Sequence, residues 1–266
     1  MPERAIGIFD SGVGGLTVLR ELRHQLPREE LVYLGDTARV PYGTKSSQTV
    51  ARYAQEAARF LVGQRVKLLV VACNTASAVA LDDLAARHRL PVVGVIEPGA
   101  RRALDVTRSG RIGVIGTEGT IRSRAYERAL RAGNPDVEVH VAPCPLFVPL
   151  AEEGWSEHPV ARLAAAEYLA PLLRQGIDTL VLGCTHYPLL KRTLQEVAGS
   201  AVELIDSAAE TAKTVAALLH AEGLERHDAP PASPRFFVTD LPDRFERVGG
   251  AFLGAPLTGV ATVSLD

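Results

Sequence analysis

The 266-residue sequence predicts an α/β protein of two pseudosymmetric lobes, each a mostly parallel β-sheet flanked by helices, with a cleft between the lobes. Three observations predict this fold. Short β-branched runs alternate with longer amphipathic stretches, several of these runs are apolar throughout, and one pattern of segments occurs twice. Strands that are apolar on both faces are typical of parallel sheets covered by helices. The alternation itself favours right-handed crossovers between parallel strands.

The elements follow from hydrophobic periodicity taken in chain order. Strands are predicted where Val, Ile and Leu run together, at 5–9, 31–34, 68–71, 92–96, 112–115, 137–141, 179–182 and 202–205. Helices are predicted where apolar residues recur at helical spacing, at 16–25, 47–65, 76–89, 123–131, 159–175, 189–197 and 208–222. A last strand at 236–239 and a terminal helix with a strand complete the chain.

Three segments of the first part recur in the same order in the second part, and this indicates a duplication. The matched pairs are Ile6-Gly7-Ile8 with Ile112-Gly113-Val114, residues 69–75 with 180–186, and Val95-Ile96-Glu97 with Leu204-Ile205-Asp206. We therefore expect residues 1–97 plus 207–266 to form the first lobe, because the tail has to pack somewhere, and residues 98–206 to form the second.

Composition excludes several classes of protein. The formal net charge is −2 and the basic clusters are short, which argues against a nucleic-acid-binding face. No run approaches the roughly 18 to 20 apolar residues that a membrane span needs, and the first residues lack a signal-peptide pattern. We expect a cytoplasmic protein without a membrane or nucleic-acid partner.

The three cysteines are too few for a disulfide framework, and their spacing fits no structural zinc site. Two of them, Cys73 and Cys184, occupy matching places in the repeat, each after an apolar strand and before small polar residues. Backbone N–H groups at such a turn favour a thiolate. A free cysteine is otherwise a small buried hydrophobe, and we interpret the third, Cys144, in that way.

A matched pair of cysteines suits the inversion of a carbon stereocentre. One group removes a proton from one face while the other delivers a proton to the opposite face, and thiolate and thiol exchange these roles when the reaction reverses. General acid–base groups work best when their pKa lies near the operating pH. The site is expected in the cleft, because ligands of open α/β sheets bind at the carboxyl ends of the strands.

Polar residues beside the two cysteines are the next candidates. Asp10 and Ser11 end the first strand before a glycine-rich turn, and the turn alone could hold an anion or only begin a helix. Asp10 could bind a substrate ammonium, polarise Cys73 or cap a helix. His186, two residues after Cys184, could exchange a proton with that cysteine or with the substrate.

Further candidates offer hydroxyl, amide or turn geometry for a substrate. Asn74, Thr75 and Thr185 adjoin the cysteines and could bind carboxylates or cap helices. The remaining candidates lie in other turns: Pro41, Tyr42, Gly43, Thr117, Thr120 and Glu152. Local sequence does not distinguish Glu152 from Glu153.

Four ordered blocks resemble the signature blocks of bacterial glutamate racemases. They are Asp-Ser-Gly-Val-Gly-Gly-Leu-Thr-Val at 10–18, Tyr-Leu-Gly-Asp-Thr-Ala-Arg-Val-Pro-Tyr-Gly at 33–43, Ala-Cys-Asn-Thr-Ala-Ser at 72–77 and Gly-Cys-Thr-His-Tyr-Pro at 183–188. The resemblance extends from residue 6 to the Phe-Leu-Gly at 252–254.

The resemblance implies a cofactor-independent isomerase that supplies D-glutamate for peptidoglycan and forms a homodimer. It implies that Cys73 and Cys184 are the acid–base residues, assisted by Asp10, Glu152 and His186, with no metal. Cys184 would take the proton from L-glutamate and Cys73 the proton from D-glutamate. The resemblance also implies substrate contacts from Asp10, Ser11, Pro41, Tyr42, Gly43, Asn74, Thr75, Thr117, Thr120, Thr185 and His186. Some relatives carry an N-terminal extension linked to activation by a cell-wall precursor, and we expect no such activation here.

Three alternatives stay open at this point. A related two-cysteine enzyme would act on aspartate or a hydantoin. A two-lobed binding protein would close on a small anion without chemistry. A pyridoxal enzyme would need a lysine Schiff base, but the four lysines, Lys45, Lys67, Lys191 and Lys213, lack a supporting motif.

Overall fold

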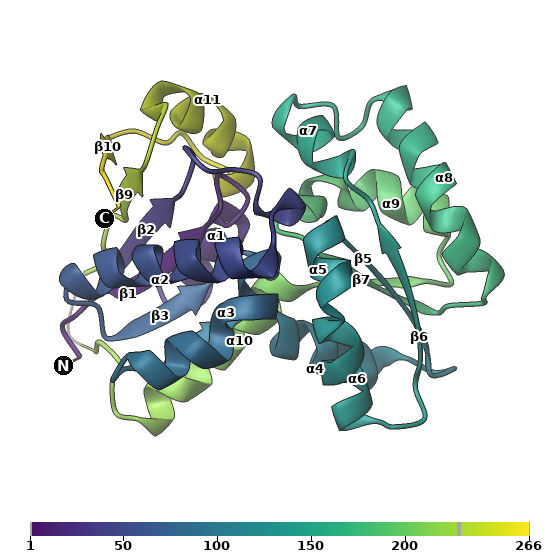
Figure 1. Ribbon diagram of the computed structural model, residues 1–266, viewed down its shortest axis with the longest axis horizontal. Coiled ribbons are helices and arrows are strands. Elements are labelled where there is room, and N and C mark those ends of the chain that lie inside the picture. Colours follow the sequence, from purple (N-terminus) through teal and green to yellow (C-terminus); the bar gives the residue numbers. More distant parts are fainter. Residues whose placement is uncertain (1, 228–229, 266) are drawn as a thin grey trace.

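The computed structural model describes residues 2–227 and 230–265, and its strands form two parallel sheets that lie side by side in Figure 1. The strands of the first sheet, in spatial order, are β10 (Val260–Thr262), β9 (Arg235–Val238), β2 (Leu31–Gly35), β1 (Ile6–Asp10), β3 (Leu68–Val71) and β4 (Val92–Gly94). Those of the second sheet are β6 (Glu138–Pro143), β5 (Arg111–Gly116), β7 (Thr179–Gly183) and β8 (Glu203–Asp206). Every strand pair is parallel, which confirms the predicted fold class.

The two sheets repeat one topology. The order β2-β1-β3-β4 in the first sheet corresponds to β6-β5-β7-β8 in the second. The registers also correspond, because Gly7 lies opposite Leu69 in the first sheet and Gly113 lies opposite Leu180 in the second. Two of the three matched sequence segments are therefore structurally equivalent.

The third matched pair was wrong by three residues. Register along β3 and β7 makes Val92-Val93-Gly94 the counterpart of Leu204-Ile205-Asp206, an offset of 112 residues (204 − 92). The predicted strand at 92–96 ends at Gly94, and the chain enters a helix at Ile96. Proline is compatible with the first turn of a helix, so Pro98 does not stop the helix there.

Strand β9, after the second sheet in sequence, pairs with β2 of the first sheet, and β10 pairs with β9. The last part of the chain thus returns to the first sheet, where both termini lie in Figure 1. This return places the helix between β9 and β10 beside the second sheet's helices.

Helices cover both faces of each sheet. They are α1 (Leu16–Gln25), α2 (Ser47–Gly63), α3 (Asn74–Arg87), α4 (Ile96–Val106), α5 (Glu118–Ser123), α6 (Ala125–Gly133), α7 (Phe147–Glu152), α8 (Pro159–Arg174), α9 (Lys191–Ala198), α10 (Ser207–Ala221) and α11 (Pro242–Leu253). The first sheet lies between α2–α3 and α1–α10, and the second lies between α4–α6 and α8–α9. Two short 3₁₀ turns, η1 (Tyr42–Thr44) and η2 (Tyr187–Leu190), follow β2 and β7.

Two helical predictions need correction, and three helices, α4, α5 and α7, were not predicted. The predicted helix at 123–131 corresponds to α6, which begins at Ala125, after Arg124, whose backbone is left-handed with φ 57°. The predicted helix at 189–197 begins as the 3₁₀ turn η2, and α9 starts only at Lys191.

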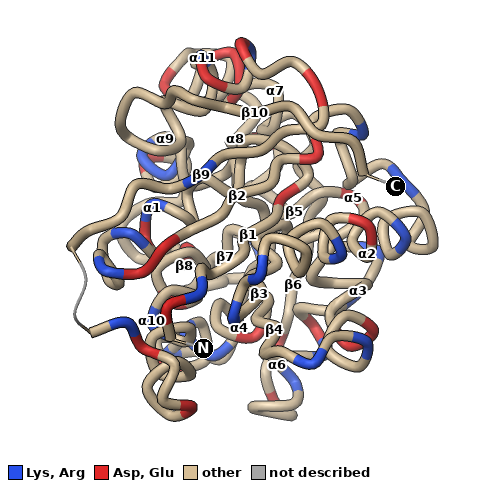
Figure 2. Tube along the Cα trace, turned by 90° about the vertical axis from the view of Figure 1, so that its left-hand side faces the viewer, with Lys and Arg blue, Asp and Glu red and all other residues tan. Residues whose placement is uncertain are grey.

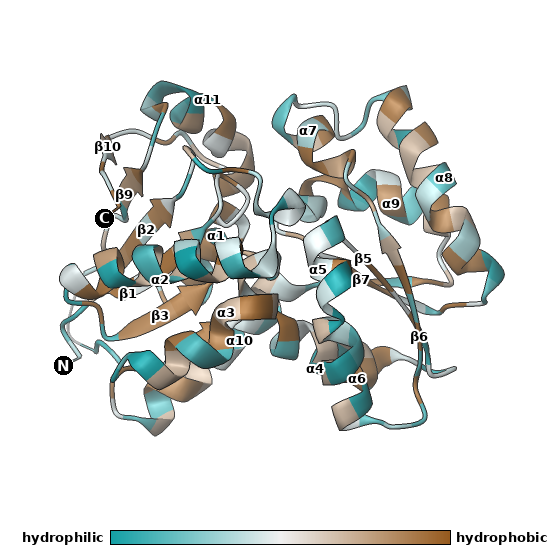
Figure 3. Cartoon of the chain, viewed as in Figure 1, coloured by the Kyte–Doolittle hydropathy of each residue, from teal (hydrophilic) through white to brown (hydrophobic). Residues whose placement is uncertain are grey.

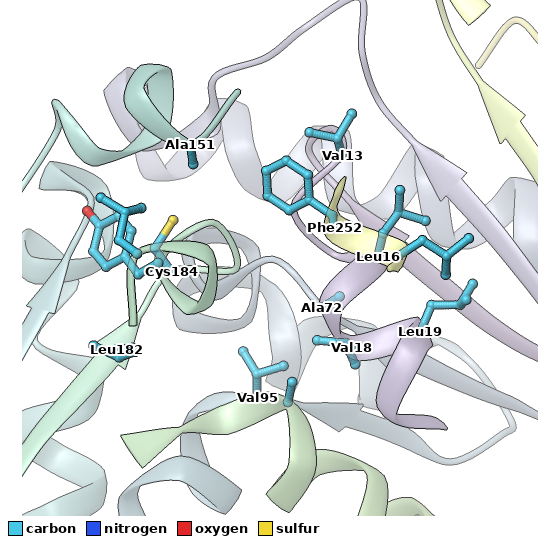
Figure 4. Close-up of a cluster of buried hydrophobic side chains, with 14 of the residues drawn as sticks. Val13, Leu16, Val18, Leu19, Ala72, Val95, Ala151, Leu182, Cys184 and Phe252 are labelled. Carbon is cyan, nitrogen blue, oxygen red and sulfur yellow. The ribbon is translucent and has the colours of Figure 1, made fainter. Parts of the chain in front are cut away.

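The central strands are the most apolar part of the chain, as Figure 3 shows by colour. One buried cluster is continuous between the two halves of the molecule. Figure 4 shows Cys184 and Ala151 from the second sheet's side in that cluster with Val13, Leu16 and Phe252 from the first sheet's side. The two halves therefore share one hydrophobic core, and Cys184 is part of it.

Charged residues lie mainly outside the sheets, with Lys and Arg interspersed among Asp and Glu in the view of Figure 2. Within residues 2–227 and 230–265, none of the helices combines the length and the apolar character that crossing a membrane requires.

Candidate active site

A small cavity lies where the carboxyl ends of β1, β3 and β7 face the turn after β2. It is lined by Ser11, Val40, Pro41, Tyr42, Gly43, Cys73, Asn74, Thr75, Thr117, Val148, Cys184, Thr185 and His186. The strand ends supply these side chains from both sheets, as expected for a ligand site of parallel sheets. Of the predicted site residues, Asp10, Thr120 and Glu152 are not in the lining but contact residues that are.

Cys73 ends the turn after β3 and is the N-cap residue of α3. Its Sγ lies 3.7 Å from the Ser11 Oγ. Burial, together with the nearby carboxylate of Asp10, raises the pKa of the Cys73 thiol to about 12. Cys73 is therefore a protonated thiol near neutral pH.

Cys184 occupies the equivalent place after β7, and its neighbours form a chain of polar contacts. Its Sγ lies 3.9 Å from His186 Nδ1, and His186 Nε2 lies 3.0 Å from Glu152 Oε1. Burial disfavours the imidazolium, but the contacts with Cys184 and Glu152 outweigh burial and raise the pKa of His186 to about 10. Glu153, which the sequence did not separate from Glu152, is exposed.

Glu152 is held from two directions. One carboxylate oxygen contacts His186, and the other accepts a hydrogen bond of 2.8 Å from the guanidinium of Arg244 in α11. Burial raises the pKa of Glu152, but His186 and Arg244 together hold it below its ordinary value. The carboxylate is thus ionised and fixed in orientation.

Asp10 is fully buried between the two halves of the site. Its Oδ2 accepts a bond of 2.9 Å from the Gly12 N–H, and its Oδ1 accepts a bond of 3.3 Å from the Thr185 hydroxyl. Burial raises the pKa of Asp10, although His186 and these donors favour its ionised form. Gly15, and not Asp10, is the N-cap residue of α1, and the backbone N–H of Gly15 also favours the ionised Asp10 carboxylate.

The glycine-rich turn after β1 packs directly against the turn after β7. A Cβ on Gly14 would lie 2.2 Å from Thr185 Oγ1 and 2.5 Å from His186 Nδ1. Such distances are far below van der Waals contact, so a side chain at this position would displace the residues that adjoin Cys184.

Three threonine hydroxyls form a triangle at one side of the cavity. Thr75 Oγ1 lies 2.9 Å from that of Thr117 and 3.1 Å from that of Thr120, and the last two are 3.1 Å apart. Each hydroxyl can rotate to donate a hydrogen bond. The triangle brings together residues from both sheets that could bind a carboxylate.

Asn74 presents an unsatisfied donor. Its Oδ1 accepts a 2.7 Å bond from the Tyr126 hydroxyl, whereas its buried Nδ2 lacks a partner among the described residues. A buried amide without a partner is costly, and Asn74 lines the cavity. The amide is therefore placed to donate to a bound ligand.

The turn with η1 closes the cavity from the side of β2. Tyr42 is fully buried and its hydroxyl bonds to Asp36. A Cβ on Gly43 would lie 2.5 Å from the Cβ of Thr117, so only glycine lets this turn approach α5 so closely. Pro41 and Val40 complete this wall.

Several residues at the site were not predicted from the sequence. Three of them lie in helices with ordinary amphipathic patterns, far in sequence from the residues they contact. Tyr126 contacts Asn74, Arg244 contacts Glu152, and Phe252 contacts His186. Cys144, interpreted as a packing residue, is buried, and its backbone oxygen accepts a bond from Tyr187. Within the described part of the chain, no group of three or more His, Cys, Asp and Glu side chains is arranged to hold a metal.

Comparison with known proteins shows the family to which this chain belongs. The model of the Asp/Glu/hydantoin racemase family matches residues 6–215, and the chain belongs to this family. Within it, the chain is 61% identical over 266 residues to a glutamate racemase of Geobacter metallireducens, covering 100% of this chain and 98% of that protein. The resemblance noted from the sequence blocks is confirmed.

Two solved structures are similar over their whole length. A glutamate racemase of Bacillus anthracis superposes with a TM-score of 0.96 at 42% identity, and the match covers 100% of this chain and 99% of that one. A glutamate racemase of Francisella tularensis in complex with D-glutamate gives a TM-score of 0.94 at 40% identity, with the same coverage. Membership in a racemase family disfavours the binding-protein and pyridoxal alternatives.

Proposed function

We propose that this chain interconverts L-glutamate and D-glutamate by moving the α-proton between two cysteines. The observation that carries the proposal is that Cys73 and Cys184 end equivalent strands of two equivalent sheets and line one cavity. A planar carbanion between two such groups can be protonated from either face. General acid–base groups of this kind contribute about 10²–10⁴-fold to a rate.

The neighbours of the cysteines support an assignment of direction. Cys73 rests as a thiol, so it is ready to donate a proton. His186 is an imidazolium that stabilises negative charge on the sulfur of Cys184. Starting from L-glutamate, the thiolate of Cys184 takes the α-proton and forms its S–H bond as the Cα–H bond breaks. The thiol of Cys73 then gives its proton to the opposite face and becomes the thiolate.

In the reverse direction Cys73 is the base, and Asp10 is placed to assist it. The carboxylate raises the pKa of the Cys73 thiol, so a proton held by Asp10 makes the thiolate easier to form. On the other side of the site, His186 assists Cys184 from 3.9 Å away from its sulfur, and Glu152 holds the His186 ring.

The remaining polar groups fit the two carboxylates and the ammonium of glutamate. The Asn74 Nδ2 and the hydroxyls of Thr75, Thr117 and Thr120 are donors for carboxylates, and the Ser11 hydroxyl lies beside Cys73. Thr185 lines the cavity and its hydroxyl donates to Asp10, whose carboxylate is the acceptor for the ammonium. Pro41, Tyr42 and Gly43 line the cavity on the side of the turn after β2. Preorganised donors stabilise charge that develops on a carboxylate in the transition state.

Glutamate is preferred over aspartate as the substrate because the relatives at 40–61% identity are glutamate racemases and one of them binds D-glutamate. We further propose that the reaction needs no metal or cofactor, since the acid, the base and the charge-stabilising donors all come from the chain.

Four wider features belong to the same proposal. The product D-glutamate serves peptidoglycan synthesis, the enzyme works in the cytoplasm, and it forms a homodimer, as its family suggests. Residues 1–97 with 207–266, and residues 98–206, act as two lobes, which the membership of the two sheets supports. Light scattering of the purified protein tests the homodimer.

Racemisation assays test the function. With chelator-treated protein, the optical rotation of L-glutamate should decay to zero, whereas L-aspartate, which is shorter by one methylene, should be racemised about 10- to 200-fold more slowly. Cys73→Ser and Cys184→Ser should each lower kcat by about 10²–10⁴-fold. A chain that leaves the rotation of L-glutamate unchanged, or either serine variant with full turnover, would contradict the proposal.

A further inference from the structure

One ion pair near the active site joins parts of the chain that belong to different sheets. Arg244 lies in the first turn of α11, between β9 and β10 of the first sheet, and Glu152 ends α7, which follows β6 of the second sheet. The Arg244 guanidinium donates to Glu152 Oε2 at 2.8 Å. Figure 1 shows α11 and α7 facing each other at the same end of the molecule.

This ion pair leads directly to a proposed catalytic cysteine. Glu152 contacts His186 at 3.0 Å through its other oxygen, and His186 contacts Cys184 at 3.9 Å. A second residue of α11, Phe252, packs edge-on against the His186 ring with 5.1 Å between ring centroids. Helix α11 therefore touches the Glu152–His186 pair at two points, one charged and one apolar.

Arg244 helps to fix the orientation of the Glu152 carboxylate. A carboxylate that accepts hydrogen bonds on both oxygens from different elements has one favoured orientation, and Glu152 is 13% exposed in its side chain. Two charged groups contact it, His186 and Arg244, and the Glu153 and Arg247 side chains line the same groove. Of the two arginines, only Arg244 forms an ion pair with Glu152 in the described structure.

Helix α11 has no counterpart in the duplicated pattern. The repeat covers β2-β1-β3-β4 and β6-β5-β7-β8, and α11 follows both. At the Cys73 side, the acidic partner Asp10 comes from β1 itself. The Cys184 side instead depends on a helix contributed from outside its own sheet.

We propose that Arg244 is a positioning residue for the Glu152–His186 pair, so that α11 must lie against α7 for the Cys184 side of the reaction to work. The inference rests on the proposed function and extends it. It assigns Arg244 no contact with the substrate. Its effect reaches the reacting sulfur only through Glu152 and His186.

The test uses five variants of the full chain in a glutamate racemisation assay. Arg244→Gln should lower kcat/KM about threefold to tenfold, in keeping with a partly exposed ion pair. Its acidic pH limb should move to higher pH, because removal of the guanidinium raises the pKa of Glu152. Arg244→Lys should recover part of the loss. Arg247→Gln, one turn away on the same helix, should stay within about twofold of the wild type.

The last two variants, Glu152→Gln and the double variant Glu152→Gln/Arg244→Gln, distinguish positioning from a general structural effect. In a Glu152→Gln background, adding Arg244→Gln should cause no further loss, because the partner it positions is already gone. An equal additional loss in that background, or an Arg244→Gln variant with wild-type kcat/KM and pH profile, would overturn the inference while leaving the proposed function intact. A wild-type chain that does not racemise glutamate would overturn both.

Discussion

Cys73 and Cys184 occupy equivalent positions but have different neighbours. Cys73 faces Ser11 and the buried Asp10, whereas Cys184 faces His186, which carries a proton near neutral pH. Duplication supplied the symmetric positions, and single residues around them made the two sides chemically distinct. This difference suits a pair in which one group begins as the acid and the other as the base.

His186 should make the stability of the fold depend on pH. Its pKa is about 10 in the folded protein and 6.5 for an unperturbed histidine. A raised pKa stabilises the fold fully below about pH 6.5, and this contribution is lost as the pH rises through about 10. Urea denaturation should show the free energy of unfolding falling between about pH 7 and about pH 9 more steeply in the wild type than in His186→Gln. If the free energy of unfolding falls equally steeply with pH in both proteins, the raised pKa of His186 is contradicted.

Tyr126 should act on the substrate through Asn74. Its hydroxyl fixes the Asn74 amide at 2.7 Å, with Nδ2 left for a ligand. Tyr126→Phe removes one neutral hydrogen bond, so KM for glutamate should rise about threefold to tenfold with a smaller change in kcat. The Asn74→Ala variant should lose more, and adding Tyr126→Phe to it should change KM no further. An undiminished effect in the double variant would show that Tyr126 acts by another route.

At the scale of elements, the turn after β1 and the turn after β7 fit together without spare room. Gly14→Ala would place its Cβ 2.2 Å from Thr185 Oγ1, so one turn must move. We expect kcat to fall at least about 100-fold, since small misplacements at a reacting centre have effects of that size. Circular dichroism should remain that of the folded protein. Gly63→Ala, at a helix position with open space around it, is the matched control, and equal activity of the two variants would contradict the packing argument.

A buried ion pair lies at the amino-terminal ends of the strands of the first sheet. Lys67, just before β3, pairs with Glu29 at 2.5 Å, and both side chains are buried. The Lys67 ammonium also donates to the backbone oxygens of Pro2 and Leu224. Glu29→Gln leaves that charge without its counterion, so the free energy of unfolding should fall by about 3 kcal/mol.

The double variant Glu29→Leu/Lys67→Met provides the control for this pair. It buries no charge and should lose less than the single variant, despite losing more polar contacts. Denaturant titrations measure the free energy of unfolding of both variants and of the wild type. A single variant as stable as the wild type would mean that water reaches the ammonium.

At the scale of the whole molecule, the sequence predicted the two parallel sheets because strand patterns are local. Continuous apolar runs such as 68–71 and 179–182 mark buried strands without any knowledge of their partners. Helix α4 was missed because Pro98 and Gly99 resemble a turn in the sequence, while in the fold Gly99 allows close packing against Ser207.

The site was predictable to the extent that its residues lie next to the strand ends. Asp10 ends β1, Cys73 lies two residues after β3 and Cys184 directly follows β7. Their convergence is a consequence of parallel topology. Tyr126, Arg244 and Phe252 reach the site from helices that carry no local mark of it. Only the packing of α6 and α11 against the other half of the chain brings them there.

The most direct test of two-base racemisation follows the α-hydrogen itself. L-Glutamate is incubated with the wild-type protein in heavy water, and the first few per cent of conversion is analysed by mass spectrometry after separating the enantiomers. Two cysteines predict D-glutamate that carries solvent deuterium at Cα, while the remaining L-glutamate keeps its hydrogen. D-Glutamate that retains the original hydrogen would mean that a single group removes and returns the same proton, which contradicts the assignment of Cys73 and Cys184 to opposite faces.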